Sequence, residues 1–210
     1  MNNRVAAVRI LINSFDIELN ARNNAGITNP KINQTPLERA ADAGFHDIVD
    51  LLISIPEVDV NAEDALGWTP LHSSSSRNRL KVVEKLINHP MIDINKKRIL
   101  GIRNIQLIYR TPIHDAADRG NVEVLQLLIG HPQIDINLTD DCGISALQWC
   151  VEREQLETAK VLLNDPRTDI ASANPLGQTA LHWAVSKKKP DFVKLLMTHS
   201  SIDINQIDTI

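Results

Sequence analysis

Hydrophobic residues recur along this chain in short stripes with helical spacing, and each stripe is followed by a segment in which hydrophobic and polar residues alternate. One stripe consists of Val82, Val83, Leu86 and Ile87. This spacing buries one side of a helix, so it predicts a helix over roughly residues 80–88. His89-Pro90 ends that helix, because proline disfavours helical backbone at the residue before it. Residues 91–95 then alternate Met-Ile-Asp-Ile-Asn, which predicts an extended segment leading into a turn.

The alternating segment repeats. Its copies are Val58-Asp59-Val60-Asn61, Ile92-Asp93-Ile94-Asn95, Ile134-Asp135-Ile136-Asn137 and Ile202-Asp203-Ile204-Asn205. A second phrase, of the type Thr-Pro-Leu-His, begins at Thr35, Thr69, Thr111, Ser145 and Thr179, in steps of 34, 42, 34 and 34 residues. Self-similarity at a nearly fixed period predicts a stack of similar units, each in contact only with its neighbours.

The second phrase carries the signals that begin and end a helix. Thr69 is suited to cap a helix, and Pro70 stands at the first helical position, where its missing N–H costs nothing. The helix is expected over roughly 70–76. A left-handed residue is expected two positions after it, and in successive units this residue is Gly44, Asn78, Gly120, Glu154 and Lys188. Glutamate and lysine put some strain on that turn.

A period of 34 also fits the tetratricopeptide repeat, but that repeat needs several aromatic positions, and aromatic residues make up only 3% of this chain. The Thr-Pro-Leu-His phrase instead resembles the ankyrin repeat over about residues 4–205. The resemblance implies an all-α solenoid with β-hairpin loops, built as an ankyrin repeat stack of about five units plus an N-terminal half repeat.

One domain is expected over residues 1–210. Its parts are an N-terminal half repeat at 4–20, repeats at 35–61, 69–95, 111–137, 145–171 and 179–205, and enlarged hairpins at 21–34 and 96–110.

The resemblance also assigns structural roles. It implies that His72, His114 and His182 hydrogen-bond the backbone of a neighbouring hairpin. The Asp-x-Asn residues are expected to satisfy turn amides. Some ankyrin proteins are hydroxylated at such asparagines, so modification of Asn61, Asn95 or Asn137 is a further hypothesis.

Composition narrows the function classes. The formal charge is -4 and the pI is about 6.0, so the chain has no overall field that attracts nucleic acid or anionic lipid. The sequence shows no charged-then-apolar leader and no apolar run long enough to span a membrane, which predicts no membrane insertion. Cys142 and Cys150 lack zinc-motif spacing and are expected to be reduced thiols in a cytoplasmic protein. No metal site, cofactor, phosphate loop or activated nucleophile is predicted, so the chain is not expected to be an enzyme.

The hairpin at 96–110 breaks the pattern. It is eight residues longer than a regular one, the difference between steps of 42 and 34, and it is apolar and basic with no acidic residue. Two interpretations are open: the hairpin packs down on its neighbours, or part of it stays exposed as a docking element. The candidate contact residues within it are Ile99, Leu100, Ile102, Arg103 and Ile105.

The ankyrin resemblance implies that hairpin tips and first helices line a concave face that contacts the partner. Candidate residues there are Leu66, Trp68, Arg77, Arg119, Ile144, Trp149, Arg153, Leu176, Trp183 and Lys187. Tryptophan and arginine dominate interface energetics. A structural role is an equally open interpretation for Trp149 and Trp183, whereas Trp68 is the better interface candidate.

The sequence therefore predicts a non-catalytic, monomeric scaffold that binds another protein, with no nucleic acid and no cofactor. The units that end in Ile-Asp-Ile-Asn are similar to those in ankyrin proteins of intracellular bacteria and protists. One hypothesis is therefore that the protein is an effector that engages a host protein. The alternative is a targeting or substrate-recruiting domain of a longer enzyme or secreted effector whose catalytic part lies outside this chain.

Overall fold

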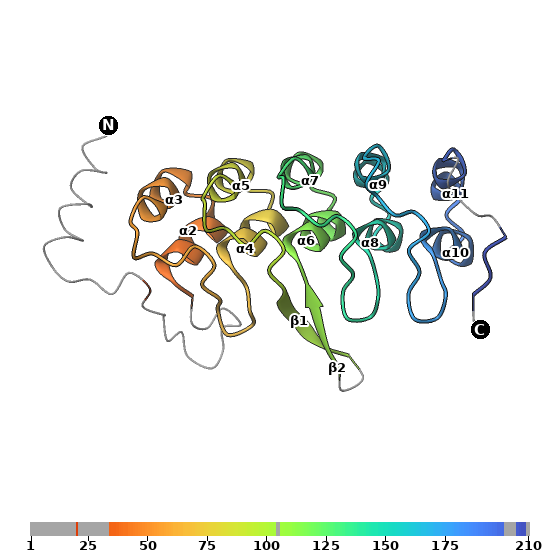
Figure 1. Ribbon diagram of the computed structural model, residues 1–210, viewed down its shortest axis with the longest axis horizontal. Coiled ribbons are helices and arrows are strands. Elements are labelled where there is room, and N and C mark those ends of the chain that lie inside the picture. The colour runs from red at the N-terminus through yellow and green to blue at the C-terminus, as the bar shows by residue number, and fades with distance from the viewer. Residues whose placement is uncertain (1–19, 21–33, 104–105, 200–204, 209–210) are drawn as a thin grey trace, which may run out of the picture.

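The computed structural model describes residues 20, 34–103, 106–199 and 205–208, apart from the side chains of 99–108. The described residues form a row of five helix pairs that runs from one end of the molecule to the other (Figure 1). The first helices of the pairs are α2 (Pro36–Ala43), α4 (Pro70–Ser76), α6 (Pro112–Arg119), α8 (Ala146–Glu152) and α10 (Ala180–Ser186). The second helices are α3 (His46–Ile53), α5 (Leu80–Ile87), α7 (Val122–Ile129), α9 (Leu156–Leu163) and α11 (Pro190–Met197). Apart from Asn20 and Gln34, the N-terminal half repeat and the enlarged hairpin at 21–34 lie outside the described residues.

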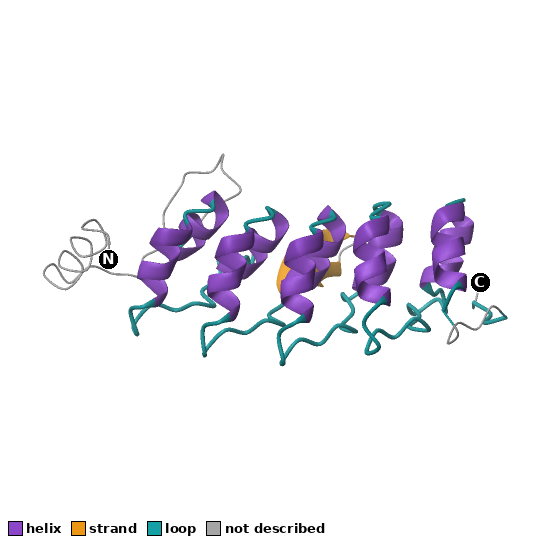
Figure 2. Ribbon diagram, turned by 90° about the horizontal axis from the view of Figure 1, so that it is seen from above, coloured by secondary structure: helices purple, strands orange, loops and turns teal. Residues whose placement is uncertain are grey.

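Each helix packs on its counterpart in the next unit, so the first helices form one layer and the second helices another. Seen from above, the pairs stand side by side and their turns lie along one edge (Figure 2). The core is a continuous seam of small and branched apolar side chains between the layers, including Leu71, Val83, Ile113 and Leu128, which are fully buried. An all-α solenoid is thereby confirmed.

The caps predicted from the sequence are present. The Thr69 hydroxyl accepts a hydrogen bond from the backbone N–H of His72 at 3.3 Å, and Pro70 is the first helical residue. The left-handed position after each first helix is also confirmed, because φ is 55° at Asn78, 61° at Glu154 and 56° at Lys188.

In the first four units, the described segments after the second helices form no paired strands. In residues 91–95, Ile92 and Ile94 are buried while Asp93 is exposed. The alternation therefore arises from one side of the segment packing under the helices. The strands described are β1 (Arg98–Arg103) and β2 (Gln106–Arg110), an antiparallel pair within the enlarged hairpin.

The four serines at 73–76 replace alanines in the first helix of the second unit. Ser73 donates a hydrogen bond to Glu38 Oε1 at 2.7 Å and thereby joins α4 to α2. Ser75 Oγ is buried and has no described hydrogen-bond partner. A small side chain is required here, but the hydroxyl of Ser75 adds an unsatisfied polar atom to the interior.

We therefore expect Ser75→Ala to raise the free energy of unfolding by about 1 kcal/mol, because alanine is the better helix former and leaves no buried hydroxyl unpaired. Urea unfolding measures this change. Ser74→Ala is the matched control: its hydroxyl donates to the Leu71 carbonyl at 3.2 Å, so its removal should gain less. Equal gains for both variants would contradict the assigned role of the unpaired hydroxyl.

Candidate functional site

The Asp-x-Asn residues join neighbouring units along one edge of the stack. Asn61 Nδ2 donates to the Met91 carbonyl at 2.6 Å, and Asn61 Oδ1 accepts from the Asp93 N–H at 2.9 Å. Equivalent pairs of bonds are made by Asn20, Asn95 and Asn137. Both polar atoms of each amide are thus used to hold the units in register. Hydroxylation of these asparagines stays a prediction.

The buried histidines have a similar architectural position. His72 Nδ1 accepts the Thr69 N–H at 3.4 Å, so the ring proton is assigned to Nε2, which donates to the Arg110 carbonyl at 3.1 Å. Burial lowers the pKa of His72 to about 3 and that of His114 to about 4. In the fourth unit Gln148 makes the same two contacts, with the Ser145 N–H at 2.9 Å and the Gln178 carbonyl at 2.8 Å. A neutral ring is therefore what the stack requires.

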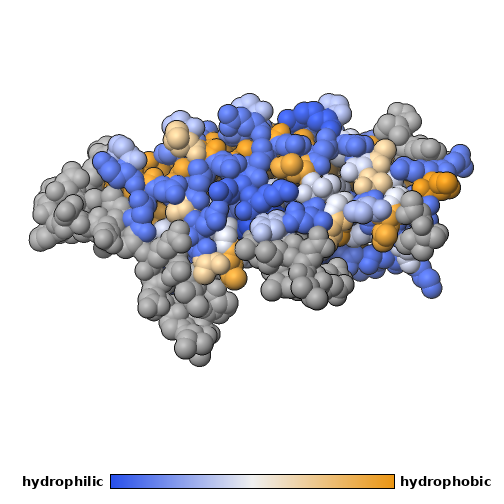
Figure 3. Space-filling model, turned by 60° about the horizontal axis from the view of Figure 1, so that its bottom comes forward, coloured by the Kyte–Doolittle hydropathy of each residue, from blue (hydrophilic) through white to orange (hydrophobic). Residues whose placement is uncertain are grey.

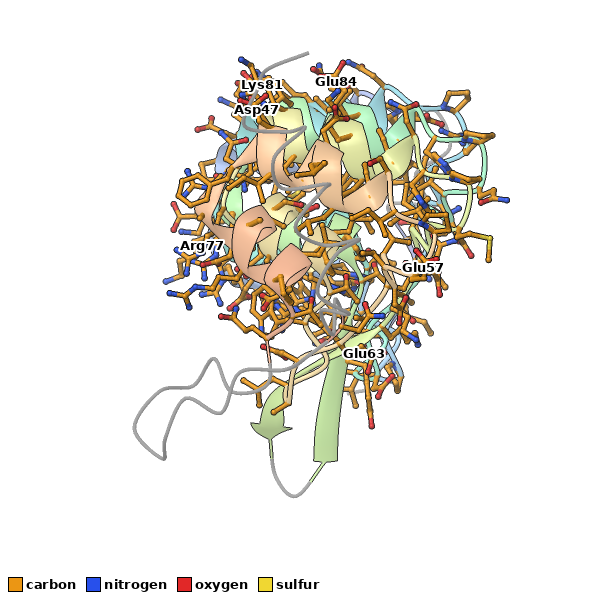
Figure 4. The ribbon with its side chains drawn as sticks, turned by 90° about the vertical axis from the view of Figure 1, so that its left-hand side faces the viewer. Asp47, Glu57, Glu63, Arg77, Lys81 and Glu84 are labelled. Atoms are coloured by element: carbon orange, nitrogen blue, oxygen red, sulfur yellow. The ribbon has the colours of Figure 1, made fainter. Side chains whose placement is uncertain are left out.

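The face made by the first helices and the hairpin tips, here called the first-helix face, carries ion pairs between successive units. Arg77 pairs with Asp42, and it projects from the side opposite Glu57 when the stack is viewed from its N-terminal end (Figure 4). Lys187 lies 2.6 Å from Glu152. Of the four cations predicted for partner contact on this face, three are paired in this way, namely Arg77, Arg153 and Lys187. Their charges already stabilise the stack, whereas Arg119 is 62% exposed and lies 3.7 Å from Asp118.

The enlarged hairpin is held at its base by an arginine on each strand. Arg98 and Arg110 are cross-strand partners in the hairpin register, and both are almost fully buried, at 3% and 2% exposure. The Arg98 guanidinium makes a two-pronged contact with Asp115, with Nε donating to Oδ2 at 2.8 Å. Its other side lies over the Trp68 ring at 3.6 Å. A charged side chain in this position is stabilised by both a carboxylate and an aromatic face.

Arg110 occupies the mirror position toward the C-terminal side. Its guanidinium lies 3.5 Å over the Trp149 ring, and its Nη1 lies 3.4 Å from Asp118 Oδ1. Its Nε and Nη2 have no acceptor among the described atoms. Burial lowers the pKa of Arg110, so this arginine is less well satisfied than Arg98.

The two lysines that precede β1 are also paired. Lys96 lies 2.9 Å from Glu63, which is labelled beside the base of the hairpin in Figure 4, and Lys97 lies 3.6 Å from Asp141. The foot of the hairpin, defined as Lys96, Lys97, Arg98 and Arg110, is therefore neutralised by four acids of the stack. The hairpin is packed down at its foot, while β1 and β2 extend beyond the neighbouring hairpin tips (Figure 1). The packed-down interpretation therefore holds for the foot, and a docking role for the rest of the hairpin stays a prediction.

Of the ten contact residues predicted on the first-helix face, nine line two grooves, one on each side of the foot of the hairpin, and Arg153 lines neither. The groove toward the N-terminus, of about 570 Å³, is lined by Leu66, Trp68, Arg77 and Arg119 together with Asp42, Asp64, Ser73 and Arg98. Charged residues of both signs line this groove. Trp68 contributes to it, but much of its ring is covered by Arg98.

The groove toward the C-terminus, called the C-terminal groove, lies between the fourth and fifth units and measures about 460 Å³. It is lined by Cys142, Ile144, Trp149, Glu152, Asn174, Pro175, Leu176, Gln178, Trp183, Ser186 and Lys187. Trp149 is buried at 8% exposure and donates its indole N–H to Asp140 at 3.1 Å, so it forms the floor. Leu176 is 50% exposed at a hairpin tip. Figure 3 shows small hydrophobic patches at several places along a mostly hydrophilic surface.

Five predicted residues cannot be placed in the site. The side chains of Ile99, Leu100, Ile102 and Arg103, and the whole of Ile105, lie outside the described residues. The sequence analysis did not predict the buried pairing of Asp115 with Arg98 or the burial of Arg110. The only sequence signal was an aspartate within the first helix of the third unit, where it looks like any solvent-facing acid.

Reactive chemistry has little support in the described residues. Neither Cys142 nor Cys150 forms a described disulfide, and burial raises the pKa of the Cys150 thiol, which disfavours the reactive thiolate. Within the described residues no group of three or more histidine, cysteine or acidic side chains could hold a metal ion. No described helix is both long and apolar enough to cross a membrane.

Stacked helix pairs, hairpin tips and cross-unit asparagine bonds define a repeat scaffold. The sequence matches the family described as ankyrin repeats (3 copies) over residues 1–98 and 108–208, and the chain belongs to the ankyrin repeat family. The unmatched residues 99–107 fall within the enlarged hairpin. No curated protein matches the sequence. Ankyrin repeats generally mediate protein–protein interaction and are typically non-catalytic.

Proposed function

We propose that this protein is a non-catalytic scaffold that binds a partner protein through its concave first-helix face, with the enlarged hairpin as a second contact. The observation that carries the proposal is the C-terminal groove. It gathers Trp183, Leu176 and Pro175 around the buried Trp149, and it leaves a large apolar side chain half-exposed at its rim. Aromatic-lined hollows of this kind are where a partner's anchoring side chain binds.

The partner segment that fits this groove has a large apolar side chain. Four cations lie at the ends of α8 and α10, and three of them, Arg153, Lys187 and Lys189, form ion pairs with acids of the stack. Lys188 has no described ion pair, and its charge favours an acidic residue beside the apolar anchor. We propose a monomer acting in the cytoplasm of the cell in which its partner resides, which includes a host cell if the protein is an effector. As a targeting or substrate-recruiting domain of a longer enzyme or secreted effector, the chain would bind its target through the same surface.

We expect Leu176→Asp to weaken partner capture by about tenfold or more, because a carboxylate at the rim opposes burial of an apolar anchor. Quantitative mass spectrometry of proteins retained by the immobilised chain measures the effect. Met91→Asp is the control, since Met91 is 72% exposed on a segment remote from the groove. Both variants should keep the thermal midpoint within about 2 °C. Equal capture by both variants would exclude the C-terminal groove as the contact.

A further inference from the structure

The part of the enlarged hairpin beyond its foot, here called the arm, is a two-stranded sheet that projects away from the helices (Figures 1 and 4). Among the described residues β1 and β2 pair only with each other, and no described backbone hydrogen bond joins either strand to a neighbouring hairpin. Each strand therefore presents one row of backbone donors and acceptors without a partner strand. Such an edge is a template for an added strand.

The two edges of the arm are not equivalent. The register pairs Ile99 with Tyr109 and Gly101 with Ile108, so β1 contains a bulge between Ile99 and Gly101. A bulge with a glycine disrupts the regular spacing that an added strand needs. β2 is regular, contains neither glycine nor proline, and is uncharged from Gln106 to Tyr109. The β2 edge is therefore the better acceptor.

The charge of the arm restricts the kind of segment that it can bind. Residues 96–110 contain five cations and no acid, but four of those cations form the foot and are paired with Glu63, Asp141, Asp115 and Asp118. The remaining cation is Arg103, whose register partner Gln106 begins β2. An arm with one cation and many apolar residues does not suit a polyanion. It suits an apolar segment with a single acidic residue.

The arm is also fixed in direction before any partner arrives. The buried contacts of Arg98 with Asp115 and Trp68 hold β1, and the His72 bond to the Arg110 carbonyl holds β2. A strand edge that does not need to be ordered on binding loses less conformational entropy.

We propose that the β2 edge of the arm accepts an extended apolar segment of a partner protein as a third strand, with an acidic residue near the Arg103–Gln106 end. The inference rests on the proposed protein-binding function and names a second mode for it. Main-chain hydrogen bonds supply the affinity of this mode, whereas side chains supply it in the C-terminal groove. Three strands are also more stable than two.

In the test, the full chain selects peptides of about ten residues from a random phage-displayed library. Each selected peptide is then synthesised in two versions, one N-methylated at its odd positions and one at its even positions, and the binding of both versions is measured. Successive residues of a strand point their N–H groups to opposite sides. One version should therefore lose binding by about tenfold to a hundredfold, and the other should bind nearly as well as the unmodified peptide. Selected peptides should be apolar with one acidic residue.

The matched control replaces residues 99–109 with Asn-Gly, a two-residue hairpin loop that joins Arg98 directly to Arg110 and keeps the foot. This variant should lose the peptides, and Leu176→Asp should retain them. Failure to select peptides, equal effects of the two N-methylation patterns, or binding that survives the shortened arm would each overturn the proposal. The proposal would also be overturned if the full chain formed a dimer and the shortened variant did not, because the β2 edge would then pair with a second copy of this chain. The effect of Leu176→Asp on partner capture through the C-terminal groove tests the proposed function independently of the arm.

Discussion

Replacing Arg98 with methionine is expected to lower the free energy of unfolding by about 3–5 kcal/mol, the usual cost of removing one partner from a buried ion pair. The substitution leaves Asp115 at 2% exposure without its two-pronged contact. It also removes the cation that lies over Trp68. Urea unfolding followed by far-ultraviolet circular dichroism measures the change, since the helices dominate that signal.

Two further variants separate the buried charge from the side-chain packing. Arg98→Met combined with Asp115→Leu should recover most of the lost stability, because no unpaired charge is then buried. Arg153→Met should cost less than about 1 kcal/mol: Arg153 pairs with Asp118 at 2.7 Å but its side chain is 51% exposed. A loss below about 1 kcal/mol for Arg98→Met itself would mean that water reaches Asp115 when the arginine is gone.

The repeating architecture could be predicted from the sequence because its determinants are local. The N-cap at Thr69, the proline at the first helical position and the left-handed residue at Asn78 all act within a few residues of one another. Even the strained positions Glu154 and Lys188 could be identified, since the period aligns them with glycines. Periodicity thus gives the fold without any knowledge of distant contacts.

The candidate site could be predicted only in outline. The aromatic positions of the C-terminal groove follow from the repeat, and the structure brings Trp149, Leu176 and Trp183 together there. The foot of the hairpin could not be predicted, because Arg98 meets Asp115 and Trp68, which are 17 and 30 positions away. A run of basic residues is usually solvated, and only the three-dimensional arrangement shows that these cations are neutralised by the stack.

Buried histidines should make the stack sensitive to mild acid. Burial lowers the pKa of His72 to about 3 and that of His114 to about 4, whereas both titrate near 6.5 in the unfolded chain. Their contribution to stability is thus complete above pH 6.5 and decreases as the pH falls from 6.5 toward 4. Each group contributes about 1.4 kcal/mol per pH unit in that range, so the free energy of unfolding should fall by about 4 kcal/mol between pH 7 and pH 5.

The fourth unit supplies the control for this effect. Gln148 bonds the Ser145 N–H and the Gln178 carbonyl without a titratable group, so His72→Gln should keep both kinds of contact and His114→Gln should keep the contact with the Thr111 N–H. At pH 7 the double variant should lie within about 1 kcal/mol of the wild type, because one neutral hydrogen-bonding side chain replaces another at each position. Urea unfolding at pH 7 and pH 5 should then give a much smaller loss for the double variant. If both proteins lose equal stability, other groups take up the protons. A smaller loss for the double variant would locate the acid sensitivity at these two buried rings.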